Sequence, residues 1–134
     1  MKTAVALLVS TCLVLVALRW SLDFQSVYQI AYGAIVGLAV SISATFFWLW
    51  HSRQTPLALG MGCSWAGTSG VLGWWWLYSR FNQPEFMAEN EFLFLFVACY
   101  FVGGILHFQV IVRSIGRKAW ALLVPMIAVV VLSL

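Results

Sequence analysis

The sequence predicts an all-α membrane protein with five transmembrane helices, and two observations support this fold class. Of the 134 residues, 63% are hydrophobic and only 8% are charged, whereas soluble domains carry roughly 25% charged residues. The charged residues also separate five long apolar runs, and about 20 helical residues cross the hydrocarbon core of a bilayer. We therefore expect one helical bundle over residues 1–134, with spans at about 3–20, 28–50, 57–78, 92–112 and 119–134.

The first three runs predict a retained first helix followed by a tight hairpin. The apolar part of the first run is longer than the h-region of a typical signal peptide, and no small-x-small cleavage site precedes Arg19. The second and third runs are separated only by "HSRQTP", residues 51–56. So short a connection requires the two helices to run antiparallel, and Pro56 suits the first turn of the third helix because its missing N–H is not needed there.

The last two runs follow an acidic loop, and the last run is short. Residues 92–112 are long enough to cross the bilayer, whereas residues 119–134 would measure only about 24 Å as a helix. Local thinning of the bilayer would accommodate this length, and a partial span is the alternative. Pro125 removes one backbone hydrogen bond from this helix, so a neighbouring helix must help to satisfy the freed carbonyl.

The distribution of basic residues predicts a cytoplasmic N-terminus and an external C-terminus. With this orientation the inner side holds five basic residues and the outer side holds two, Arg19 and Arg80. Cytoplasmic loops are the ones enriched in Lys and Arg. The inner set is Lys2, Arg53, Arg113, Arg117 and Lys118. No basic run is long enough to indicate nucleic-acid binding, so we expect a multi-pass protein of the cell membrane, of the bacterial inner-membrane type.

Small residues at four-residue spacing predict where helices pack closely. The second run carries Gly33, Gly37 and Ser41, and the third carries Gly62, Ala66 and Gly70. Such stripes let helix backbones approach each other in membranes, where burial of apolar surface gives little driving force. We expect the two stripes to face each other across the hairpin.

His107 is the only ionisable side chain that lies well inside a predicted span. A titratable group at that depth indicates a functional site, and Gly103 and Gly104, one turn earlier, leave a notch beside the imidazole, with Tyr100 two turns away on the same face. A haem or another tetrapyrrole would fit a glycine notch with a histidine ligand. The alternative is that a neighbouring helix fills the notch and His107 bonds across the interface.

A second ligand for a bis-histidine haem would have to be His51. His51 lies two residues from Arg53, whereas His107 lies six residues from Arg113. The two imidazoles therefore differ in depth by roughly 6 Å, which weakens the pairing. Trp65 lies in mid-helix and is a further candidate ligand contact.

The remaining polar residues predict no catalytic or metal site. The sequence has no zinc-type cluster, no phosphate loop and no serine–histidine–acid set at matching depth. Gln29 and Gln109 lie near helix ends, where water or headgroups would satisfy them. The hydroxyls of residues such as Ser64 and Thr68 are expected to bond carbonyls of their own helix. The three cysteines, Cys12, Cys63 and Cys99, are expected to be buried thiols rather than disulfide partners.

The tryptophans predict interfacial belts. Three consecutive residues spread over about 200° around a helix, so the triplet at 74–76 must encircle its helix rather than line one pocket. Tryptophan is enriched at the depth of the headgroups. The expected interfacial anchors are Trp20, Trp48, Trp50, Trp74, Trp75, Trp76 and Trp120.

Three functions are compatible with this pattern. The first is a non-enzymatic membrane subunit or accessory protein that packs against partner membrane proteins or copies of itself. The second is a haem- or tetrapyrrole-binding protein that uses His107. The third is a small oligomeric transporter or channel, although five helices without an inverted repeat are few for a self-contained transporter.

Overall fold

The computed structural model describes residues 2–116 and 123–133, and all of its regular elements there are helices. They include four long helices that cover the first four predicted runs, one short helix in the acidic loop and one helix in the last run. Their bounds are α1 Lys2–Ser21, α2 Phe24–Arg53, α3 Pro56–Arg80, α4 Glu85–Ala88, α5 Phe92–Ile115 and α6 Leu123–Ser133. Trp120 and the first residues of the predicted last span lie outside the described residues.

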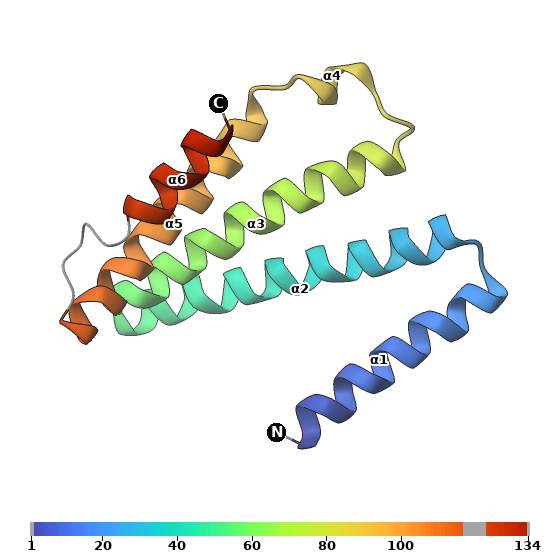
Figure 1. Ribbon diagram of the computed structural model, residues 1–134, viewed down its shortest axis with the longest axis horizontal. Helices are drawn as coiled ribbons and strands as arrows, with labels where there is room; N and C mark the ends of the chain where they lie inside the picture. The colour runs from blue at the N-terminus through green and yellow to red at the C-terminus, as the bar shows by residue number, and fades with distance from the viewer. Residues whose placement is uncertain (1, 117–122, 134) are drawn as a thin grey trace.

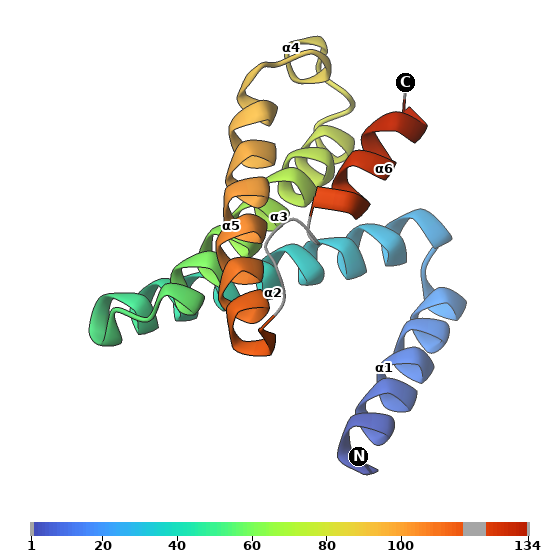
Figure 2. The same cartoon turned by 60° about the vertical axis from the view of Figure 1, so that its left-hand side comes forward.

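The helix α3 is the centre of the packed part of the molecule. It runs antiparallel to α2 along one side and packs against α5 on another (Figure 1), and these two interfaces contain most of the contacts between elements. Figure 2 shows α5 crossing α3 rather than lying parallel to it. The three helices α2, α3 and α5 therefore form the bundle, with the hairpin predicted from the short 51–56 connection.

Glycines make the α3–α5 interface unusually close. A Cβ on Gly60 would lie 2.6 Å from the backbone nitrogen of His107, and one on Gly67 would lie 2.6 Å from the carbonyl oxygen of Phe96. From the other side, a Cβ on Gly103 would collide with the backbone nitrogen of Ser64. Real Cβ atoms do not approach so closely, so glycine on both helices is what allows the backbones to touch.

The predicted pairing of two small-residue stripes is wrong in its register. On α2, Gly33 lies against the Trp76 ring, but Gly37 has nothing within 4 Å of its virtual Cβ and Ser41 is exposed. The face of α2 that meets α3 instead contains Val36, Ala39, Ser43 and Phe47.

The stripe on α3 is divided between two neighbours. Gly62 packs against the Phe47 ring of α2, whereas Gly70 packs against the Phe96 ring of α5. Residues four apart are offset by about 40° around a helix, so two steps rotate a stripe by about 80°. Because α3 has neighbours on two sides, that rotation carries the stripe from one interface to the other.

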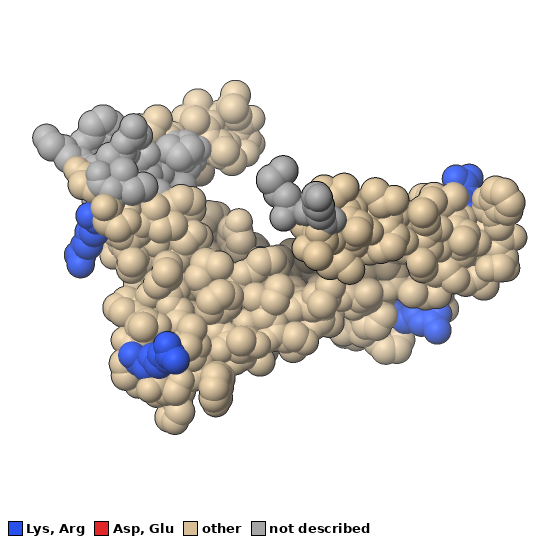
Figure 3. Space-filling model, turned by 90° about the horizontal axis from the view of Figure 1, so that it is seen from below, with Lys and Arg blue, Asp and Glu red and all other residues tan. Residues whose placement is uncertain are grey.

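Within the described residues, three helical segments are long and apolar enough to cross a membrane: Thr3–Ser21, Phe24–Arg53 and Glu85–Ser114. The helix α3 is long enough but is enriched in Gly, Ser and Trp, a composition that suits a helix packed between two others. The face in Figure 3 is almost entirely uncharged, with basic groups toward the two ends.

The helix α1 diverges from α2 after the turn that joins them (Figure 1), and none of its apolar window is buried within the chain.

Candidate functional site

His107 lies in the α3–α5 interface. Its backbone packs on Gly60, its ring stacks on Phe108 with centroids 4.5 Å apart, and the ring is partly exposed. Its Nδ1 atom is buried and has no hydrogen-bond partner among the described residues. The hydroxyl oxygen of Ser64 in the same interface is also buried and without a partner in the described chain. The close interface thus contains two buried polar atoms without partners, and burial of such atoms costs free energy.

The glycine notch beside His107 is filled on one side and open on the other. The α3 backbone occupies the Gly103 side, where Gly60 O would lie 2.7 Å from an added Cβ, but nothing lies within 4 Å of a Cβ on Gly104. Of the two alternatives for the notch, a neighbouring helix therefore takes the Gly103 side. The Gly103 side therefore has no room for a tetrapyrrole. Binding of a tetrapyrrole stays a prediction only for the Gly104 side, and an absorption spectrum of the purified protein tests it.

The other candidate ligand contacts differ in how far they are buried. His51 is exposed in the last turn of α2, and Tyr100 is 50% exposed on α5 with its ring against Phe101. Trp65 is half-buried on α3. Among the described residues there is no group of three or more histidines, cysteines or acids that could hold a metal ion.

Two hydroxyls of α3, those of Thr68 and Ser69, bond to backbone carbonyls of their own helix, whereas the Ser64 hydroxyl, for which the same bond was expected, has no partner among the described residues. Thr68 donates to Ser64 O at 2.9 Å within its own helix, as predicted. Cys99 contacts Cys63 O at 3.5 Å across the α3–α5 interface, and the cysteines are free. Cys63 and Cys99 are half-buried, and the expectation of buried thiols is wrong for Cys12, which is exposed because α1 has so few neighbours.

The tryptophan triplet encircles α3, as its sequence predicts. Trp76 donates from Nε1 to Gln29 O of α2 at 3.0 Å, and Trp74 donates to Met87 O of α4 at 3.0 Å. Trp75 points outward, is 39% exposed and makes an edge contact with Tyr78. Two of the three indoles therefore attach α3 to neighbouring elements, and the third faces away from the bundle.

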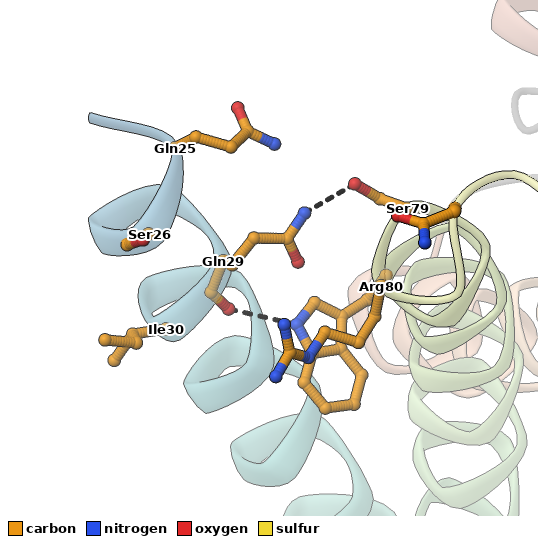
Figure 4. Close-up of a pocket in the computed structure, with 8 residues that line it drawn as sticks. Gln25, Ser26, Gln29, Ile30, Ser79 and Arg80 are labelled. Atoms are coloured by element: carbon orange, nitrogen blue, oxygen red, sulfur yellow. Dashed lines mark hydrogen bonds between the residues drawn. The ribbon is translucent and has the colours of Figure 1, made fainter. Parts of the chain in front are cut away.

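An open cavity of about 420 Å³, lined by both polar and apolar groups, lies where the first turns of α2 meet the last turn of α3. Figure 4 shows Gln29 reaching across to Ser79, to which its Nε2 donates, while its backbone carbonyl accepts from Trp76. The Arg80 side chain extends from α3 toward α2 in the same view. None of the residues lining the cavity is acidic.

Gln29 is the residue that sequence reasoning undervalued. Its position near a helix end predicted simple solvation, but it bridges α2 and α3, and its Oε1 is buried without a partner among the described residues. The sequence did contain a signal: Gln29 is a polar residue at the start of α2, and tryptophans lie at the end of α3. A tight hairpin between α2 and α3 brings these two helix ends side by side.

Comparison with known proteins gives no match to a family model, to a curated protein or to a solved structure. The functional argument therefore depends on this chain's own residues.

Proposed function

We propose that this chain is a non-enzymatic integral membrane protein that assembles, within the bilayer, with partner membrane proteins or with copies of itself. The observation that carries the proposal is how little of the chain its own helices cover. Only 11% of the apolar window of α2 and 6% of that of Glu85–Ser114 are buried, and α1 is not buried at all. In the described chain no large side chain is fully buried.

The outward face of α2 supports this proposal. Gly37 leaves an open position, and Ser41 and Thr45 satisfy their hydroxyls on carbonyls of the same helix at 2.9 and 2.8 Å. A smooth stripe of small residues with no unsatisfied donor is the surface that allows close helix–helix contact in a membrane. Because α3 does not use this stripe, it is available to a helix from another chain.

The threading that we propose is five spans with the N-terminus in the cytoplasm, in a cell membrane of the bacterial inner-membrane type. It is supported by the five-to-two distribution of basic residues. It also requires α3, which is less apolar, to cross while covered by α2 and α5, and the short last helix to cross a locally thinned bilayer.

The experiment is to measure the mass of the full chain in mild detergent, after chemical cross-linking in native membranes. We expect a complex larger than the monomer, reduced by Gly37→Leu and Ser41→Leu, which would hold a partner helix away. Ala98→Leu, on an exposed part of α5, is the matched control. Monomers alone, with no co-purifying protein, would contradict the proposal.

A further inference from the structure

Cys63 of α3 and Cys99 of α5 bring their thiol groups together across the interface between these helices. The Cys99 sulfur lies 3.5 Å from the Cys63 carbonyl oxygen, and the two thiols also lie within hydrogen-bonding reach of each other. Both thiols are free, and both side chains are half-buried. Two cysteines that are 36 positions apart in the sequence therefore form one thiol pair, which is not sealed from its surroundings.

The backbones of α3 and α5 touch on both sides of this pair. One turn after Cys63, a Cβ on Gly67 would lie 2.6 Å from Tyr100 Cα. One turn after Cys99, a Cβ on Gly103 would lie 2.7 Å from the Cys63 carbonyl carbon. Packed helices usually keep their axes about 8–10 Å apart, whereas a disulfide usually joins Cα atoms about 4.4–6.8 Å apart. Glycine contacts of this kind are what bring cysteines on two helices toward that shorter range.

The thiol pair lies well inside both helices. Cys63 is seven residues beyond Pro56, where α3 begins, and Cys99 is seven residues beyond Phe92, where α5 begins. Seven residues correspond to about 10 Å along a helix axis, and the hydrocarbon core of a bilayer is about 30 Å thick. Charged molecules enter that core at a high cost, so an oxidant that reaches the pair in a bilayer must dissolve in lipid.

We propose that Cys63 and Cys99 form a redox-active pair, which a lipid-soluble quinone converts to a disulfide. Two S–H bonds break and one S–S bond forms, and the two electrons and two protons pass to the quinone, which becomes a hydroquinone. Reactants and products are all uncharged, which suits a site where a buried charge is costly. The disulfide joins α3 to α5 covalently. This inference rests on the proposed placement of the helices in the bilayer and not on the proposed assembly.

The test uses the full chain with the substitution Cys12→Ser, so that Cys63 and Cys99 are its only thiols. Decylubiquinone is added to the chain in liposomes, and the free thiols are counted after denaturation. We expect both thiols to disappear with the loss of two hydrogen atoms by mass spectrometry, and to return on reduction with dithiothreitol. Oxidised glutathione, which is polar, should react at least about ten-fold more slowly. A disulfide between two chains, a quinone adduct or equal rates with the two oxidants would overturn the proposal.

Two matched comparisons test the geometry. Cys99→Ser combined with Ala98→Cys moves the thiol by about 100° around α5, to an exposed position, and should prevent the disulfide at the same number of thiols. Gly103→Ala, which must push α5 away from the Cys63 backbone, should slow its formation about ten-fold. Gly104→Ala, where the added methyl meets open space, should leave the rate unchanged. A disulfide with the moved thiol, or equal rates in the two glycine variants, would overturn the proposal.

Copper phenanthroline, a general thiol oxidant, separates the contact from the quinone step. It is applied to the detergent-solubilised monomer, whose helix content is checked by circular dichroism. We expect it to form the same disulfide and to raise the thermal unfolding midpoint by about 5 °C or more. No disulfide in a fully helical chain would contradict the contact, and a disulfide with copper phenanthroline but not with decylubiquinone would overturn the quinone step. Neither failure changes the mass of the cross-linked complex, which tests the assembly separately.

Discussion

Gly103 of α5 lies directly against the backbone of Ser64 of α3, so closely that a side chain at position 103 has no room. The next residue, Gly104, has open space where its side chain would be. Two adjacent glycines on the same helix therefore have opposite structural roles. One permits an interface, and the other only lowers the local preference for helix.

Gly103→Ala should destabilise the α3–α5 interface, while Gly104→Ala should not. The added methyl at position 103 must push the two backbones apart, at an expected cost of about 1–3 kcal/mol, typical of overpacking. At position 104 the same change should be neutral or stabilising by up to about 1 kcal/mol, because alanine favours the helix. Thermal unfolding in detergent, followed by circular dichroism, measures both. Equal effects of the two changes would contradict the close packing of Gly103 against the Ser64 backbone.

Trp76→Phe should weaken the attachment of α2 to α3. The change keeps an aromatic ring against Gly33 but removes the indole N–H that bonds to Gln29 O. The expected loss is about 1 kcal/mol in the free energy of unfolding. Trp75→Phe is the control, because Trp75 is 39% exposed and should shift unfolding by less than about 0.5 kcal/mol. A larger effect of Trp75→Phe would show that the outward indole has a structural partner.

Ser43→Ala should also weaken the attachment of α2 to α3. Ser43 is 6% exposed, and its hydroxyl donates to Gly62 O of α3 at 3.0 Å. Hydrogen bonds between membrane helices contribute about 0.6 kcal/mol on average. Ser41→Ala removes a hydroxyl that bonds only within α2, so no change is expected for the monomer. The difference in unfolding free energy between the two variants isolates the contribution of the bond between helices.

The sequence was sufficient for the features that depend on local composition. Charged residues between apolar runs predicted the helices, the 51–56 connection predicted the hairpin, and the spacing of 74–76 predicted that the indoles encircle α3. The register between helices was not predictable, because four-residue spacing is compatible with any face. Gly37 belongs to the predicted packing stripe of α2, but its side faces open space rather than α3.

The site at His107 was predictable only as two alternatives. A glycine notch looks the same in the sequence whether a ring or a backbone fills it, and the packing of α3 against Gly103 decides between them on that side. The cavity around Gln29 and Arg80 was missed: the predicted hairpin brings these residues, 51 positions apart in the sequence, to the same level, but it does not determine which side chains face each other there.

Asp23 should titrate below its ordinary pKa, and Ser26 should be the cause. The hydroxyl of Ser26, and then its backbone N–H, bond the Asp23 carboxylate and lower its pKa from 3.8. Because the folded pKa is lower than the unfolded one, the capping of α2 is complete above pH 3.8 and is lost as the pH falls through the lower, folded pKa. At neutral pH the cap is therefore intact.

Substitution at Ser26 and Asp23 separates the charge from the cap. Carboxyl titration by ¹³C NMR should give a midpoint below 3.8 in the native chain and a midpoint closer to 3.8 in Ser26→Ala. Asp23→Asn keeps a capping acceptor without a charge, so the first turn of α2 should stay protected from hydrogen exchange at every pH, whereas Asp23→Ala should lose that protection about five-fold. An unchanged midpoint in Ser26→Ala would mean that the Ser26 hydroxyl is not the main cause of the lowered pKa of Asp23, because this variant keeps the backbone N–H that caps α2.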